Sequence, residues 1–151
     1  MDGASNQRRS RILVIEDNPA DVELLRRALR YAGLDCELAV IDDGADALTF
    51  VRQSGTLSGG PVPDLAIVDL NLPKHGGLEI VAAMRANPLF SELAVVILTS
   101  SSAPRDRAVL ERFQIARYMV KPPDLDEFLK IGSELKQILA AHDRRERSIP
   151  T

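Results

Sequence analysis

Short apolar runs alternate with amphipathic segments along most of the chain. The apolar runs lie at residues 12–15, 36–41, 65–68, 93–98 and 117–120. Runs of this length, bounded by turn residues, are typical of buried strands in a parallel sheet. Charged residues at Asp35, Glu37 and Asp42 surround the second run, which favours a position at the edge of the sheet. The pattern therefore predicts five strands.

Apolar residues between these runs repeat at helical spacing. After the first run, Asn18 and Pro19 provide a helix start, and Val22, Leu25 and Leu29 continue one apolar face. Further helices are predicted at residues 45–53, 78–86, 104–113 and 124–141, with Asp124 as the cap of the last one. Residues 54–63 hold three glycines and two prolines, which predicts an exposed loop between a helix and a strand.

The alternation of strands and helices predicts the fold class. Five strands alternating with five helices indicate an α/β protein, a doubly wound (βα)5 sandwich. Right-handed crossovers and short early connections favour a flavodoxin-like, parallel five-stranded sheet with strand order 2-1-3-4-5. We expect a flexible segment at residues 1–10, one domain at 11–141, and a basic tail at 142–151 that frays or extends the last helix.

Composition narrows the class of protein. The chain has 151 residues, of which 45% are hydrophobic and 27% charged, and its net charge of −3 argues against a nucleic-acid binder. No run approaches the roughly twenty apolar residues of a membrane span, and residues 1–10 lack the apolar stretch of a secretory signal. The single cysteine, Cys36, is interpreted as core filler in a reducing compartment. We therefore expect a cytoplasmic protein without membrane or nucleic-acid partners.

Acidic residues directly follow two of the predicted strands. The first run leads into Glu16 and Asp17, and the third leads into Asp69. Because ligand sites of open parallel sheets lie outside the carboxyl ends of the strands, these three carboxylates are expected to converge. Converging carboxylates repel one another and require a cation, and oxygen ligands suit Mg²⁺ better than Zn²⁺.

The fourth and fifth runs add a hydroxyl at Thr99 and an ammonium group at Lys121. Carboxylates, a cation and these two donors together match phosphoryl transfer to a carboxylate nucleophile. Asp69 stands alone on the central strand and is the predicted nucleophile, which leaves Glu16 and Asp17 as metal ligands. Any one of these acids could be a helix cap or a solvated loop residue, but the combination favours a functional site.

The segments that carry these residues resemble the signature segments of response-regulator receiver domains. They are residues 12–19, 64–69 with 71–73, 98–100 and 118–122, and the resemblance extends over about residues 10–141. It implies that Asp69 is the phosphoacceptor for the phosphohistidine of a sensor histidine kinase. It also implies that Thr99 and Lys121 bind the phosphoryl group, and that Tyr118 is a switch aromatic that turns inward as Thr99 moves toward the phosphate.

The same resemblance assigns a metal site and a class of regulator. Asp17 and Asp69 would hold Mg²⁺ directly, Glu16 through water, and Asn71 through its backbone carbonyl. Residues 16–21, 70–74 and 121–128 are similar to small stand-alone regulators of phytochrome-type sensor kinases. The expected protein is a signalling switch, not an enzyme beyond its own phosphotransfer and autodephosphorylation. A downstream protein target and a homodimer through the fourth helix, fifth strand and fifth helix are further expectations.

The sequence departs from the family pattern at two places, and two other functions are compatible with parts of it. His75 stands where an acidic residue usually precedes a glycine, and is interpreted as a solvated loop residue rather than a metal ligand. Gln114 and Ile115 stand where Gly-Ala is usual. The alternatives are a phosphorylation-independent adaptor and an Asp-nucleophile phosphatase, but the latter usually has a second acid at the position of Asn71.

Overall fold

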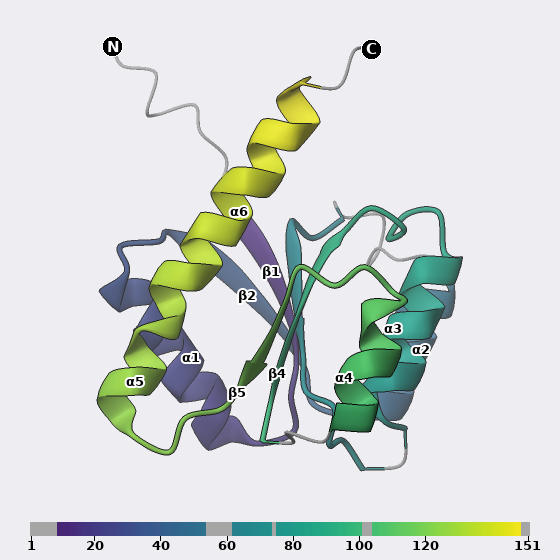
Figure 1. The fold of residues 1–151 in the computed structure, drawn as a ribbon, viewed down its shortest axis with the longest axis horizontal. Helices are drawn as coiled ribbons and strands as arrows, with labels where there is room; N and C mark the ends of the chain where they lie inside the picture. The colour runs from purple at the N-terminus through teal and green to yellow at the C-terminus, as the bar shows by residue number, and fades with distance from the viewer. Residues whose placement is uncertain (1–8, 54–61, 74, 101–103, 149–151) are drawn as a thin grey trace.

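The computed structural model describes residues 9–53, 62–73, 75–100 and 104–148 (Figure 1). Its elements in chain order are β1 Ser10–Ile15, α1 Pro19–Tyr31, β2 Cys36–Ile41, α2 Gly44–Gln53, β3 Leu65–Val68, α3 Gly77–Ala86, β4 Ala94–Thr99, α4 Pro104–Glu111, β5 Arg117–Val120, α5 Leu125–Leu129 and α6 Ile131–Ser148. The five predicted strands are confirmed. Most of the loop predicted at 54–63 lies outside the described residues.

The strands form one parallel sheet in the order β2-β1-β3-β4-β5. Ile15 at the end of β1 pairs with Ile41 of β2 and with Val68 of β3, and Val68 pairs with Ile97 of β4. The carboxyl ends of neighbouring strands therefore meet at one edge. The predicted flavodoxin-like order 2-1-3-4-5 is confirmed, and so is the edge position of β2.

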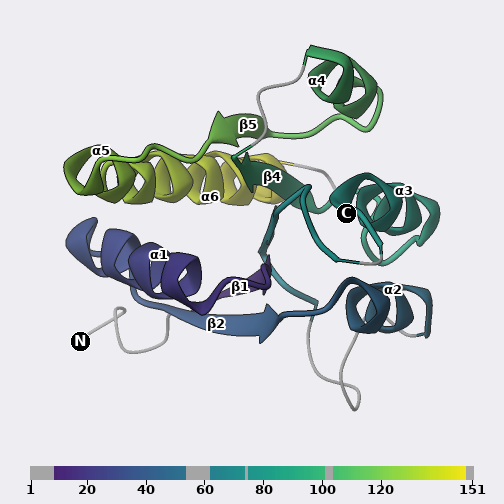
Figure 2. The ribbon, with the colours of Figure 1, turned by 90° about the horizontal axis from the view of Figure 1, so that it is seen from below.

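Helices cover both faces of the sheet (Figure 2). α1, α5 and α6 lie on one face, and α2, α3 and α4 on the other. Alternate residues of β1 serve the two sides: Ile12 and Val14 belong to the core under α1 and α6, and Leu13 and Ile15 to the core under α2 and α3. The central strands are apolar throughout because each of their faces is buried.

The first helix begins and ends as its sequence predicts. The Asn18 side chain accepts a hydrogen bond from the Ala20 N–H at 2.9 Å, and Pro19 occupies the first helical position. The chain leaves α1 through Gly33, whose φ of +75° lies in the left-handed region. This start orients α1 at the carboxyl edge of the sheet, directly after Glu16 and Asp17.

The prediction of one helix over residues 124–141 is wrong. The Asp124 side chain does cap α5, since it accepts a hydrogen bond from the Glu127 N–H at 3.3 Å. This helix ends at Leu129, and the N–H of its C-cap, Lys130, bonds back to the Phe128 carbonyl. α6 then begins at Ile131 and continues to Ser148, so the tail extends the last helix, one of the two expected outcomes, and in Figure 1 this helix extends well past the sheet. Phe128 and Ile131, on either side of the break, are both buried, 2% and 4% exposed.

Gly132 permits the close packing of α6 on α1. A Cβ atom at this position would collide with the backbone carbonyl of Ala28 and would also crowd the Ala32 side chain. The tight approach of the two helices therefore depends on the absence of a side chain at one residue.

Arg85, near the end of α3, ties together the two loops that precede β4 and β5. Its guanidinium donates hydrogen bonds to the carbonyls of Phe113 at 2.7 Å, Leu93 at 2.8 Å and Phe90 at 2.9 Å. It also reaches the carbonyl of Gln114 at 3.3 Å, and Gln114 has a φ of +54°. These loop carbonyls are thereby satisfied at the amino edge of the sheet, opposite the predicted site.

Candidate functional site

Short extensions of the sheet ladder position the predicted site residues. The N–H of Glu16 bonds to the Ile41 carbonyl at 3.1 Å, and that of Asp69 to the Ile15 carbonyl at 3.0 Å. The N–H of Lys121 bonds to the Thr99 carbonyl at 2.7 Å. Residues that follow three different strands are therefore held in register with their neighbours. The structure brings the predicted acids, hydroxyl and ammonium group to one edge, as expected.

Three carboxylates gather at this edge. Glu16, Asp17 and Asp69 each offer an oxygen atom, and these atoms lie within 4.8 Å of one another. Glu16 and Asp69 are buried, at 6% and 5% exposed, whereas Asp17 is exposed. An all-oxygen donor set with several negative charges fits a hard divalent cation such as Mg²⁺ or Mn²⁺.

The Lys121 ammonium group lies among the acids and is itself nearly buried, with its side chain 12% exposed. Its Nζ is 2.7 Å from Glu16 Oε1 and 3.0 Å from Asp69 Oδ2. A third carboxylate, Asp21 of α1, lies 2.7 Å away through Oδ2. Sequence reasoning gave Asp21 no role of its own, although it lies in the first turn of the helix that follows Asp17.

The ionisation of these groups follows from burial and from their partners. Burial raises the pKa of Glu16 to about 7. The hydrogen bond from Lys121 acts to lower this pKa, whereas the negative charge of Asp69 acts to raise it. Burial also acts to raise the pKa of Asp69, but hydrogen bonds from the Asn71 N–H and Lys121 outweigh it and leave this pKa below its usual value. Burial acts to lower the pKa of Lys121, yet its bonds to Asp21, Glu16 and Asp69 raise it. The site therefore keeps Asp69 ionised beside a protonated lysine.

Asn71 organises the space between β3 and β4. Its N–H donates to Asp69 Oδ1 at 3.0 Å, and its Nδ2 donates to Thr99 Oγ1 and Ser100 Oγ, both at 3.3 Å. Thr99 is fully buried, 0% exposed. The sequence predicted a role for the Asn71 backbone carbonyl, which remains a prediction. It did not predict this side-chain bridge.

Tyr118 and His75 contact residues other than the three carboxylates that gather at the edge. The Tyr118 ring is half-buried on β5, and the Arg107 guanidinium of α4 stacks over it at 4.6 Å from the ring centre. His75 Nδ1 lies 3.0 Å from Glu79 Oε1 of α3. The switch role of Tyr118 stays a prediction, and His75 is engaged on α3 rather than in the acidic group.

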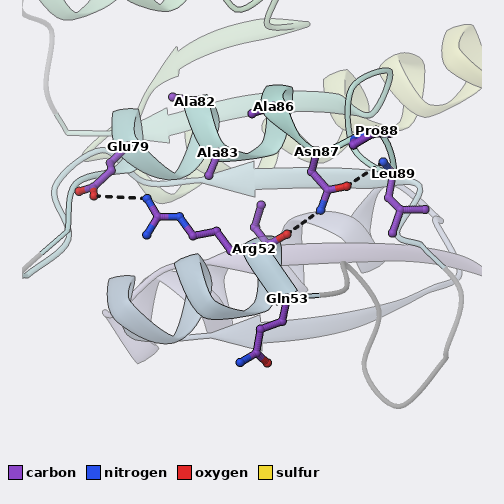
Figure 3. Close-up of a pocket in the computed structure, with 10 residues that line it drawn as sticks. Arg52, Gln53, Glu79, Ala82, Ala83, Ala86, Asn87, Pro88 and Leu89 are labelled. Atoms are coloured by element: carbon purple, nitrogen blue, oxygen red, sulfur yellow. Dashed lines mark hydrogen bonds and ion pairs between the residues drawn. The ribbon is translucent and has the colours of Figure 1, made fainter.

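A separate groove between α2 and α3 has a volume of about 660 Å³ and is shown in Figure 3. Small side chains such as Ala82, Ala83 and Ala86 line it. Its polar groups pair with each other: Arg52 lies 4.0 Å from Glu79, and Asn87 Nδ2 donates to the Val51 carbonyl at 2.6 Å. This groove therefore lacks the convergent charged groups that distinguish the sheet edge.

Comparison with known proteins agrees with this geometry. The model of the response regulator receiver domain matches residues 12–132, which includes Glu16, Asp17, Asp69, Thr99 and Lys121. The chain belongs to the response-regulator receiver family. Receivers of this family are signalling switches and not enzymes in the usual sense.

The receiver is similar to small regulators of phytochrome signalling. Response regulator Rcp1 of Synechocystis is 34% identical over 120 residues, which are 80% of this chain and 82% of Rcp1. The structure of the phosphorylated cyanobacterial phytochrome response regulator RcpA matches with a TM-score of 0.79 at 28% identity, over 89% of this chain and 96% of RcpA. The Mn²⁺-bound form of Rcp1 matches with a TM-score of 0.75 at 32% identity, over 85% and 92% of the two chains.

The helices were compared with the length and hydropathy of membrane-spanning helices. Within the described residues, none of them combines the length and the apolar character that crossing a bilayer requires.

Proposed function

We propose that this receiver accepts a phosphoryl group on Asp69 from a sensor histidine kinase, with Mg²⁺ as cofactor. The placement of Lys121 carries this proposal, because its ammonium group lies 3.0 Å from Asp69 Oδ2 in a nearly buried site. The other oxygen, Oδ1, accepts from the Asn71 N–H. A carboxylate nucleophile must be ionised and oriented, and a fixed ammonium group beside it, here that of Lys121, serves both needs.

The residues of the chain have distinct parts in this reaction. An oxygen of Asp69 forms a bond to phosphorus as the bond from phosphorus to the donor histidine nitrogen breaks. Thr99 and Lys121 donate hydrogen bonds to the equatorial oxygens of the transferred group, over which its negative charge is spread in the transition state. Mg²⁺ held by Glu16, Asp17, Asp69 and the Asn71 carbonyl would supply further charge neutralisation.

The phosphoryl group would then act on the surface of the receiver. It adds about −1.5 to −2 charges at neutral pH and attracts Thr99 and Lys121. Both residues adjoin β5, where Tyr118 lies under α4. We infer that the face formed by α4, β5 and the α5–α6 segment, which covers the predicted fifth helix, responds and binds a downstream protein or a second copy. Val120 and Leu125 expose apolar side chains on this face, 41% and 48% exposed.

The similarity to RcpA and Rcp1 supports a kinase of the phytochrome type as the donor. RcpA is a phytochrome response regulator of cyanobacteria whose phosphorylated form has been crystallised. Phosphotransfer from autophosphorylated phytochrome-type kinases, compared with other histidine kinases of the same cell, tests this inference. Faster transfer from a kinase of another sensory class would contradict it.

The phosphoacceptor is tested with acetyl phosphate and Mg²⁺, followed by intact-mass measurement. We expect one phosphoryl group on the wild type and none on Asp69→Asn. Asp64→Asn is the matched control, since Asp64 lies at the other end of β3 and its Oδ2 accepts a bond from the Arg11 N–H. Labelling of Asp69→Asn would contradict the assignment. An unlabelled wild type would favour an adaptor, and turnover of small phosphoesters would favour a phosphatase.

A further inference from the structure

Asp21 contributes a carboxylate to the site but does not belong to the group of Glu16, Asp17 and Asp69 that could hold a cation. It lies in the first turn of α1, and its side chain is 23% exposed. Its Oδ2 is 2.7 Å from Lys121 Nζ, closer than the 3.0 Å that separates this Nζ from Asp69 Oδ2. The three carboxylates that converge within 4.8 Å are Glu16, Asp17 and Asp69, without Asp21.

Lys121 has three N–H donors and three carboxylate partners. Two of these partners, Glu16 and Asp69, belong to the group suited to a cation. They therefore change their charge environment when a cation binds, and Asp69 also changes chemically when it is phosphorylated. Asp21 takes part in neither change. Its bond to Lys121 can persist through the whole cycle.

Asp21 also comes from a different element than the other partners. Glu16 and Asp69 follow β1 and β3, whereas Asp21 lies on α1, which packs against α5 and α6. Its bond therefore fixes Nζ relative to the helical layer and not only relative to the sheet edge. A buried lysine side chain has many rotamers, and one strong additional bond to a fixed acceptor restricts them.

We propose that Asp21 is a positioning residue: it holds the Lys121 ammonium group where the group meets a phosphoryl oxygen on Asp69. This inference rests on the proposed function, because it concerns the same phosphoryl site. An acidic residue in the first turn of a helix also stabilises the helix through its dipole. That effect requires no contact with Lys121, so the two roles predict different outcomes for phosphoryl binding.

The test separates binding of the metal from binding of a phosphoryl analogue. Mg²⁺ affinity is measured by calorimetry, and affinity for beryllofluoride in saturating Mg²⁺ by fluorine NMR, with the rate of phosphorylation by acetyl phosphate alongside. We expect Asp21→Ala to weaken beryllofluoride binding and to slow phosphorylation about tenfold, the effect of losing one charge-assisted hydrogen bond. Mg²⁺ affinity should change by less than about threefold, because Asp21 and the cation are more weakly coupled across the site.

Two further variants complete the test. Asp21→Asn keeps an acceptor oxygen without the charge, and should recover most of the beryllofluoride affinity. Glu23→Ala removes a carboxylate from the same helix, where Glu23 lies near Arg27 and Arg30 rather than Lys121, and should behave as the wild type.

Three results would overturn the inference. These are wild-type beryllofluoride binding by Asp21→Ala, tighter binding by both Asp21 variants, and an equal loss of Mg²⁺ and beryllofluoride affinity. The second would show that Asp21 acts through its negative charge, and the third that it acts through the structure of the whole site. If the wild type itself binds no beryllofluoride, the proposed function fails and the positioning role fails with it.

Discussion

The position and conformation of single residues in this receiver depend on the groups that their polar atoms contact. Lys121 is the clearest case, because one ammonium group contacts three carboxylates in a site where Glu16 and Asp69 are nearly inaccessible. Negative charge is therefore in excess, which is the electrostatic reason why a divalent cation suits the edge. Gln114 is a second case, since its backbone adopts φ of +54° although it has a side chain.

Replacing Gln114 with glycine should stabilise the receiver. Side chains disfavour the left-handed region, which costs about 1 kcal/mol for an ordinary residue and nothing for glycine. After the entropy cost of glycine in the unfolded chain, we expect the free energy of unfolding to rise by about 0.5 kcal/mol in urea titrations. Gln114→Ala, which retains the Cβ atom, is the control and should show no gain. A loss of stability in Gln114→Gly would contradict this interpretation.

At the scale of elements, the helical pattern at the end of the chain does not reveal where the helix is interrupted. The segment from Leu125 to Ser148 continues a helical pattern, yet it forms α5 and α6 with a break at Lys130. The break coincides with the approach of Gly132 to the Ala28 carbonyl of α1. α6 therefore packs closely on α1 immediately after the break.

Gly132→Ala should reverse the usual sign of this substitution in a helix. Alanine ordinarily stabilises a helix interior by about 1 kcal/mol relative to glycine. Here the added Cβ would collide with the Ala28 carbonyl, and overpacking costs about 1–3 kcal/mol, so we expect a net loss in thermal or urea unfolding. Ser133→Ala, at the adjacent exposed position, should instead be neutral or slightly stabilising. Equal gains in both variants would contradict the packing argument.

At the scale of the whole molecule, the site couples cation binding to stability. Glu16, Asp17 and Asp69 follow β1 and β3 in the middle of the sheet, so their mutual repulsion opposes folding of the entire domain. A cation bound there stabilises the folded state by mass action. Cation binding and the stability of the fold therefore depend on the same carboxylates.

Mg²⁺ should raise the melting temperature of the wild type, and Asp17→Asn should remove most of this rise. At a hundred times its dissociation constant, a ligand adds about 2.7 kcal/mol to the free energy of unfolding. Without Mg²⁺, we expect Asp17→Asn to melt above the wild type, because one repelling charge is gone. Glu23→Gln is the control and should keep the full Mg²⁺ response. An unchanged Mg²⁺ response in Asp17→Asn would exclude Asp17 as a ligand.

The sequence by itself determined the strands, their order and the residues that meet at the edge. It could do so because buried parallel strands are apolar runs, and because chain connectivity places every strand end on the same side. Glu16, Asp17, Asp69, Thr99 and Lys121 were all readable as the residues that follow such runs. The subtype followed from short segments around them.

Only the tertiary structure decided which hydrogen-bond partners these residues have. The bond from Lys121 to Asp21 joins positions 100 residues apart, and the Asn71 side chain reaches Thr99 and Ser100 from another strand. The close packing of Gly132 of α6 on the Ala28 carbonyl of α1 likewise joins segments that are distant in the sequence. Local patterns record what a segment prefers, whereas side-chain pairing and close packing depend on distances between segments, which exist only in the folded chain.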